Sequence, residues 1–143
     1  MKLIPYKKEH LETIMFNELV TKEFNPKELI AASAEKAIAY TGITDADEVV
    51  FICGVTKLWS KVYEVWFLIS DLFEKNARQS FKLVLKLKAT IAHISYKRIQ
   101  ADINESIPKN IRFIEHLGYT FEGRMPKFGI NGETYLRYAL YGD

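Results

Sequence analysis

The spacing of hydrophobic and polar residues switches between strand and helix periods along the chain, which predicts a mixed α and β protein. Two stretches, Glu48–Lys57 and Val62–Ser70, are rich in β-branched and aromatic residues and are the strongest predicted strands. A long amphipathic stretch over Asn76–Ser95 follows them and predicts a helix. These three segments form the centre of the expected fold.

Shorter segments on both sides complete the expected order of elements. We expect a strand at Leu3–Pro5, a helix over His10–Leu19, a helix starting at Asn25-Pro26, a strand at Lys36–Gly42, a polar turn at Thr44–Asp47, a strand at Arg98–Ile103, and two strands at Tyr119–Lys127 and Glu133–Tyr141 joined by a tight turn at Asn131-Gly132. No repeat, low-complexity tract or interdomain linker interrupts this order, so we expect a single domain over residues 1–143.

The segment Asn110–Gly123 predicts a short helix, a stop and an emerging strand. Apolar residues recur there at helical spacing, namely Ile111, Ile114 and Leu117. Pro108 suits a first helical turn, and Ser106 is placed to cap it. Gly118 is placed to adopt the left-handed conformation that ends many helices. The segment therefore predicts both ends of one helix.

Composition limits the class of protein. A chain of 143 residues with 48% hydrophobic content can bury a core without help, and its net charge of +2 implies no particular partner. Cys53 is the only cysteine, which excludes an internal disulfide and favours a reducing compartment. No apolar run approaches the ~20 residues of a membrane span. We expect a cytoplasmic protein, and no His, Cys and Asp cluster has metal-ligand spacing.

The predicted long helix is strongly basic. Between Lys75 and Arg98 there are seven basic residues and no acidic one. Four of them share one helical face: Lys75, Arg78, Lys82 and Lys86. Positive side chains at a helix start reinforce the positive end of the helix dipole, which favours phosphate binding. An ordinary solvated face of an amphipathic helix explains the pattern equally well.

The order of elements and two motifs resemble the GNAT superfamily of N-acyltransferases. Leu117-Gly118-Tyr119 followed by Glu122-Gly123 is similar to the C-terminal pattern of that family. Trp66-Phe67-x-x-Ser70-Asp71 before the basic helix, with Ile111-Arg112-Phe113-Ile114 after it, resembles GNAT-like proteins of tailed phages, including internal virion proteins. The resemblance runs from about residue 48 to the end. It implies an α/β (α+β) fold with a mixed, mostly antiparallel sheet of about six or seven strands, flanked by about four helices.

The resemblance also implies acetyl-CoA or another acyl-CoA as cosubstrate. In this family the fourth strand splays from the fifth to leave a slot for the pantetheine arm, and the implied lining residues are Phe67, Leu68 and Ile69. The family's pyrophosphate loop, which opens the long helix, corresponds to Glu74–Ser80, a stretch without glycine. Its implied phosphate contacts are Lys75, Asn76, Ala77, Arg78, Gln79 and Ser80. Asn104 and Asn110 are the candidates for holding the arm.

For catalysis, the resemblance implies direct attack of an amine on the acyl group. Glu64 on the fourth strand is the implied general base, although strand alternation can equally direct it to solvent. The family's proton-donating tyrosine corresponds to Ile114, which cannot transfer a proton.

The sequence and the resemblance are therefore compatible with three alternative functions. The first is an acyl-CoA-dependent N-acyltransferase with an unidentified amine acceptor. The second is a catalytically inactive GNAT-fold structural or morphogenesis protein of a phage, located in the host cytoplasm or the virion and contacting virion proteins. The third is a module that binds a polyanion through the basic helix, with nucleic acid the less favoured partner.

Overall fold

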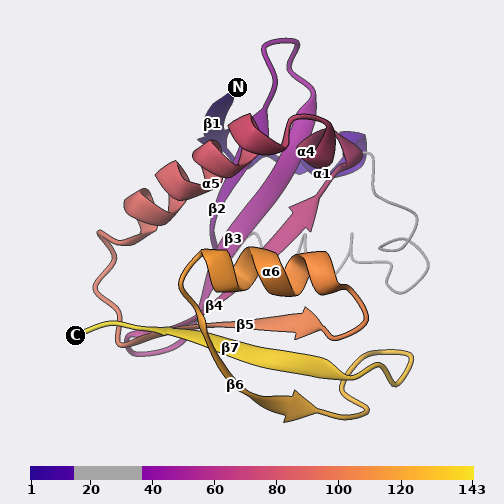
Figure 1. The fold of residues 1–143 in the computed structure, drawn as a ribbon. Coiled ribbons are helices and arrows are strands. Elements are labelled where there is room, and N and C mark those ends of the chain that lie inside the picture. The colour runs from indigo at the N-terminus through magenta and orange to yellow at the C-terminus, as the bar shows by residue number, and fades with distance from the viewer. Residues whose placement is uncertain (15–36) are drawn as a thin grey trace. The chain divides into compact units, whose positions relative to one another are not determined.

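The computed structural model describes residues 1–14 and 37–143. In chain order its elements are β1 (Lys2–Pro5), α1 (Lys8–Thr13), β2 (Ala37–Ile43), β3 (Val49–Trp59), β4 (Val62–Ile69), α4 (Asp71–Lys75), α5 (Ala77–Ile91), β5 (Arg98–Asn104), α6 (Pro108–His116), β6 (Thr120–Met125) and β7 (Tyr135–Tyr141), as Figure 1 shows. The seven strands form one sheet in the order β1-β2-β3-β4-β5-β7-β6, in which the β4–β5 pair is parallel. This mixed sheet and the four helices of the described residues confirm the predicted fold class.

The long helix differs from its prediction at both ends. It is preceded by a separate short helix, α4, which ends where the Asn76 N–H donates to the Leu72 carbonyl. At its other end α5 stops at Ile91 rather than Ser95. The amides of His93 and Ile94 donate to carbonyls three residues back, so the chain tightens into a turn before β5.

The first helix and the loop before β7 also differ from the predictions where the structure describes them. The first helix spans Lys8–Thr13, and both the predicted remainder of it beyond Ile14 and the helix at Asn25-Pro26 lie outside the described residues. The expected tight turn at Asn131-Gly132 is present, because the Gly132 amide donates to the Gly129 carbonyl and Gly132 has a φ of 83°. The loop around it is longer than predicted, since β6 ends at Met125 and β7 begins at Tyr135.

The described chain divides into two compact units, and the first comprises Met1–Thr56 and Trp66–Ile94. Successive residues of β3 point to opposite faces of the sheet. Ile52 belongs to a buried cluster that α1 and β4 complete, whose members are Leu11, Ile14, Ile43, Val49, Ile52 and Leu68. Phe51 points the other way, where its ring contacts those of Phe67 and Phe73. The first unit therefore has apolar contacts on both faces of its strands.

The second unit comprises Lys57–Val65 and Ser95–Asp143. Strand β5 pairs with β4 and β7, and β7 pairs with β6. Helix α6 packs on one face of these strands, where the buried side chains are Ile99, Ala101, Ile114, Leu117, Leu136 and Tyr138. The alternate residues of β5 point to the opposite face and are polar, so one strand separates a core from a polar surface.

The ends of α6 follow the sequence in part. Pro108 occupies the first turn, but the N-cap residue is Ile107, so the predicted cap by Ser106 is wrong. The Ser106 hydroxyl and amide instead donate to the Asn104 side chain. Gly118 has a φ of 89°, as predicted, and two hydrogen bonds, from Gly118 N to Glu115 O and from Tyr119 N to Ile114 O, complete a Schellman motif.

Candidate active site

The second unit carries a network of charged side chains on the face opposite α6. The strand register brings its members together: Glu64 lies opposite Gln100, and Asp102 lies opposite Arg137. We call this set the polar face, and its members are Glu64, Arg98, Gln100, Asp102, Glu122, Arg137 and Tyr141. They come from four strands that are distant in sequence, so only the folded sheet assembles them.

A bidentate ion pair lies at the centre of the polar face. The Arg137 guanidinium donates from Nε to Asp102 Oδ1 at 2.9 Å and from Nη2 to Oδ2 at 3.2 Å. The Asp102 side chain is only 12% exposed, and paired hydrogen bonds of this kind compensate a buried carboxylate better than a single contact. Burial opposes ionisation of Arg137, but the hydrogen bonds to Asp102 outweigh it and raise the pKa of Arg137.

Glu64, the predicted base, lies beside this ion pair and not in open solvent. Glu64 is half-buried and lies on the same face of the sheet as Asp102, which is two residues beyond its register partner Gln100 on β5. Burial raises the pKa of Glu64 most, the hydrogen bond and negative charge of Asp102 raise it further, and the positive charge of Arg137 opposes them. Asp102 already accepts both hydrogen bonds from Arg137, so a hydrogen bond between the two carboxyl groups would need its proton on Glu64.

A second ion pair lies along the same face. Strand β6 is bulged between Phe121 and Gly123, so Glu122 has no partner in the register with β7. Its carboxylate pairs with Arg98, which donates from Nη1 to Oε2 at 2.7 Å, and accepts from the Tyr141 hydroxyl. The Arg98 hydrogen bond is the main reason that the pKa of Glu122 falls to about 2. The bulge thus anchors the edge strand to β5 and β7.

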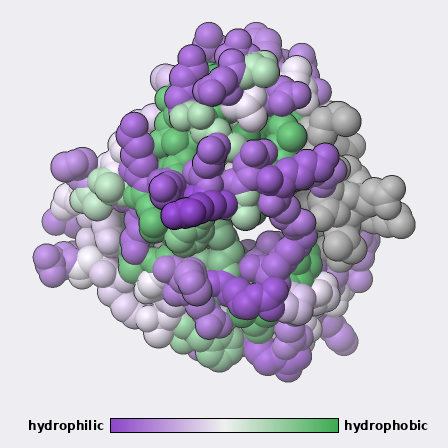
Figure 2. Space-filling model, turned by 45° about the horizontal axis from the view of Figure 1, so that its top comes forward, coloured by the Kyte–Doolittle hydropathy of each residue, from purple (hydrophilic) through white to green (hydrophobic). Residues whose placement is uncertain are grey.

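The predicted phosphate-binding residues surround the break between α4 and α5 in the first unit. Lys75, Asn76, Ala77, Arg78 and Gln79 are all exposed, and the side face of α5 that carries Lys82 and Lys86 is exposed too. Figure 2 shows hydrophilic side chains over much of the surface in its view. No side chain caps α5, so the amides of its first turn have no partner within the helix.

Ser80, unlike the other predicted phosphate-binding residues, is buried. Its side chain is 0% exposed, and its hydroxyl lies 3.9 Å from Met1 Sδ. Ser80 lies three and four residues before Leu83 and Val84, which are buried on the same helix face. The helical period turns this residue inward, so its burial does not favour the phosphate contact, which stays a prediction.

The three predicted slot residues on β4 differ in their surroundings. Leu68 is 5% exposed and belongs to the buried cluster of the first unit. Phe67 and Ile69 are half-buried, and by alternation they point away from that cluster. The roles of Phe67, Leu68 and Ile69 in binding an acyl-CoA stay predictions.

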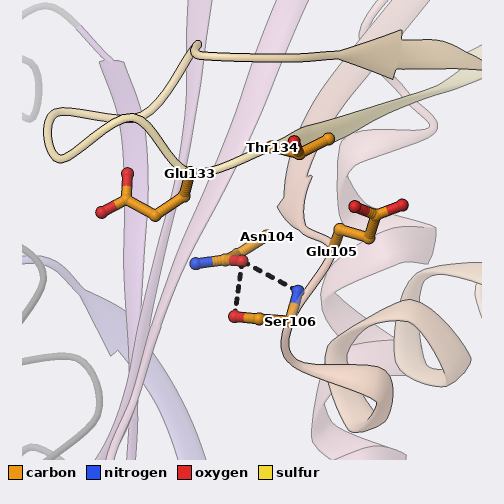
Figure 3. Close-up of a pocket in the computed structure, with 5 residues that line it drawn as sticks. All are labelled: Asn104, Glu105, Ser106, Glu133 and Thr134. Atoms are coloured by element: carbon orange, nitrogen blue, oxygen red, sulfur yellow. Dashed lines mark hydrogen bonds between the residues drawn. The ribbon is translucent and has the colours of Figure 1, made fainter.

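The two predicted asparagines lie at the end of β5 and in α6. Asn104 borders a pocket together with Glu105, Ser106, Glu133 and Thr134 (Figure 3). Its Oδ1 accepts from Ser106 N at 2.9 Å and from Ser106 Oγ at 2.8 Å, so it orders the turn that leads into α6. Asn110 is half-buried, and its amide donates to the Ile107 carbonyl.

Further observations concern Ile114, metal ligands and membrane spans. Ile114 is 1% exposed, so the position where the resemblance expects a proton donor belongs to the core of the second unit. Among residues 1–14 and 37–143, no three His, Cys, Asp or Glu side chains come together as a metal site, and no helix is long and apolar enough to cross a membrane.

Sequence reasoning did not identify the partners of Glu64. Asp102 and Arg137 were not among the predicted site residues, nor were Arg98, Glu122 and Tyr141. One signal was available: polar residues alternate with apolar ones from Arg98 to Asn104, which marks a strand with one polar face.

Comparison with known proteins finds similar folds among solved structures. No protein-family model and no curated protein matches the chain. Among solved structures, the chain is similar to Ard1 from Thermoplasma volcanium, with a TM-score of 0.80 and 12% identity over 98% of this chain and 96% of that one. It is also similar to a GNAT-family acetyltransferase from Bacillus anthracis, with a TM-score of 0.73 and 16% identity over 99% and 95%.

A third similar structure is an aminoglycoside 6'-N-acetyltransferase complexed with coenzyme A, with a TM-score of 0.74 and 16% identity over 99% of this chain and 97% of that one. At these identities the likeness concerns the fold alone. The chain therefore has the fold of the GNAT-family acetyltransferases.

Proposed function

We propose that this protein is an N-acyltransferase that moves the acyl group of an acyl-CoA, such as acetyl-CoA, to an amine, with Glu64 as the general base. The observation that carries this proposal is the half-buried Glu64 carboxyl on the polar face, whose pKa is raised by burial and by Asp102, which makes its ionised form a stronger base. The fold supports the same reaction class, because the similar structures include acetyltransferases, one of them complexed with coenzyme A.

The proposed reaction requires one bond to form and one to break. Ionised Glu64 accepts a proton from the ammonium form of the acceptor, and the free amine nitrogen then attacks the thioester carbonyl carbon. The carbon–sulfur bond breaks, the nitrogen releases its remaining extra proton to water as the amide forms, and the departing thiolate takes a proton from water. Glu64 then returns its own proton to the solvent. Positioning supplies a large part of the rate in such a transfer, so the absence of an acid at Ile114 slows the last step without preventing it.

The start of α5 supplies the proposed contacts for the phosphates of the cosubstrate. The amides of Ala77, Arg78 and Gln79 have no partner within the helix, and the helix dipole favours an anion there. Lys75 and Arg78 are exposed and add positive charge. These residues fit a pyrophosphate, whereas buried Ser80 takes no part.

A matched pair of variants tests the role of Glu64. Acetyl transfer is measured as release of free thiol from acetyl-CoA in the presence of small amines and of peptides with free N-termini. We expect Glu64→Gln to lower kcat/KM by about 10²- to 10⁴-fold, as loss of a general base does. The control is Glu12→Gln, which alters an exposed carboxylate on α1 and should leave the rate unchanged. A Glu64→Gln enzyme as active as the control would contradict the proposal.

Calorimetry with acetyl-CoA tests the cosubstrate separately. Arg78→Glu should weaken binding by about 10- to 100-fold, which corresponds to the loss of one charge-assisted contact. Lys86→Glu is the matched control, because it makes the same charge change on α5 about 12 Å further along the helix. Equal effects of both variants would refute a specific contact, and no binding at millimolar acetyl-CoA would refute the enzyme.

A second function is favoured by two features of the same fold. The stretch Glu74–Ser80 contains no glycine, and Ile114 is buried where a proton donor is expected. These features suit a GNAT-fold protein that serves as a structural or morphogenesis component of a phage particle, in the host cytoplasm or the virion. This alternative predicts no acetyl-CoA binding and stable association with virion proteins, which co-purification from infected cells would test.

A further inference from the structure

The neighbours of Glu64 on the polar face are fixed by strand register. Glu64 on β4 lies opposite Gln100 on β5, and Asp102 is two residues further along β5 on the same face. Arg137 lies directly opposite Asp102 on β7 and holds both of its carboxylate oxygens. The bidentate contact fixes the orientation of the Asp102 side chain, because rotation of the carboxylate would break one of the two hydrogen bonds.

This arrangement gives Glu64 one defined partner. Asp102 lies diagonally across from Glu64 on the neighbouring strand and on the same face of the sheet, within reach of the long Glu64 side chain. The other charged groups of the polar face are occupied with one another: Arg98 pairs with Glu122, and Tyr141 donates to Glu122. Asp102 and Arg137 are therefore the charged groups that act on Glu64 from β5 and β7, and Gln100 is the neutral group beside it.

We propose that Asp102, itself oriented by Arg137, is the positioning residue of the acyl transfer. It orients the Glu64 carboxyl group and holds the proton of that group. This inference rests on the proposed function of Glu64 as the base. Asp102 and Arg137 act in opposite directions on the same proton. The negative charge of Asp102 stabilises the protonated carboxyl, whereas the positive charge of Arg137 stabilises the ionised one. The pair thereby sets the pH at which the base becomes available.

The test follows the titration of Glu64 itself, without reference to activity. Protein labelled with ¹³C at glutamate carboxyls is titrated by NMR, and Glu64→Gln assigns the Glu64 resonance. We expect the midpoint of Glu64 to move to lower pH in Asp102→Asn and to higher pH in Arg137→Gln. Arg137→Lys retains the positive charge, so the Glu64 midpoint in this variant should lie close to that of the parent protein. Arg124→Gln, which removes the cation of an exposed ion pair with Glu105 outside the polar face, is the control and should leave the midpoint in place.

Opposite shifts in the Asp102 and Arg137 variants support the inference, because loss of packing alone would not produce them. Midpoints that do not move, or that move in the same direction, would overturn it. If Asp102→Asn does not fold, as judged by circular dichroism, Arg137→Gln and Arg137→Lys decide the question alone.

Measurements of acyl transfer distinguish a failure of this inference from a failure of the proposed function on which it rests. The pH profile of kcat/KM should follow the NMR midpoints in each variant. If the protein transfers acyl groups but the Glu64 midpoint does not move in the variants, the role of Asp102 is refuted and the proposed enzymatic function is retained. Opposite NMR shifts without transfer to any amine would refute the enzyme and leave the coupled carboxyl pair established.

Discussion

Replacing Gly54 with alanine should destabilise the first unit through a clash with one tryptophan. A Cβ atom at Gly54 would lie 2.0 Å from Cζ2 and 2.2 Å from Cε2 of Trp66. The indole cannot move away freely, because its Nε1 donates to Thr56 Oγ1 at 3.2 Å and its ring packs against the buried cluster of this unit. Glycine is therefore needed at position 54 to make room for Trp66.

The expected change in the free energy of unfolding combines two destabilising effects and one stabilising effect. Forcing one extra carbon into a packed site costs about 1–3 kcal/mol. Moving the indole also breaks its hydrogen bond, which contributes about 0.5–1.5 kcal/mol. The alanine reduces the conformational freedom of the unfolded chain, which returns about 0.4–1 kcal/mol. We therefore expect Gly54→Ala to lower the free energy of unfolding by about 2–3 kcal/mol.

Urea denaturation followed by far-ultraviolet circular dichroism measures this change. Gly123→Ala is the control, since a Cβ atom there would meet nothing within 4 Å, and it should stay within about 0.5 kcal/mol of the parent protein. Adding Trp66→Phe to Gly54→Ala should recover part of the loss, because the smaller ring removes the clash. If Gly54→Ala is as stable as Gly123→Ala, the close approach of Trp66 is not as described.

Three further predictions concern the second unit. Tyr138→Phe removes a hydrogen bond of 2.9 Å to Glu115, and urea denaturation should show a loss of about 1 kcal/mol. Gly118→Ala places a side chain at a φ of 89° and should cost about 1 kcal/mol in the same assay. Because the pKa of Glu122 is lowered to about 2, its stabilising effect is complete above the unfolded value of about 4.3 and is lost as the pH falls toward 2. Unfolding measured between these pH values should show this loss in the parent protein and a flatter dependence in Arg98→Gln.

The sequence predicted the helices and strands more accurately than the residues at which they begin and end. Strands β3 and β4 were recognisable because β-branched and aromatic residues fill them, and the end of α6 was recognisable because Gly118 alone suits a left-handed residue. Helix α4 was missed because five residues are too few to show a helical period. The end of α5 was misplaced because Ile94 continues the apolar pattern three residues after Ile91, while the hydrogen bonds of His93 and Ile94 already form a turn.

The candidate site was only partly predictable. Glu64 followed from a family resemblance, and the burial of Ser80 could have been anticipated, since its spacing to Leu83 and Val84 places it on the buried side of α5. The contact of Asp102 with Arg137 joins residues 35 apart in the chain. Such a pair depends on the register between two strands, and the polarity pattern within either strand does not contain that register.

The alternation along β5 has a consequence for how this protein can change over evolutionary time. A deletion or insertion of one residue in β5 would place Arg98 and Asp102 beneath α6 and move Ile99 and Ala101 out of the core. Changes of length are therefore excluded in this strand. Substitutions at Arg98, Gln100 and Asp102 are not, because these side chains lie on the face opposite α6. New chemistry on this sheet can thus arise by point mutation while the scaffold that presents it stays the same.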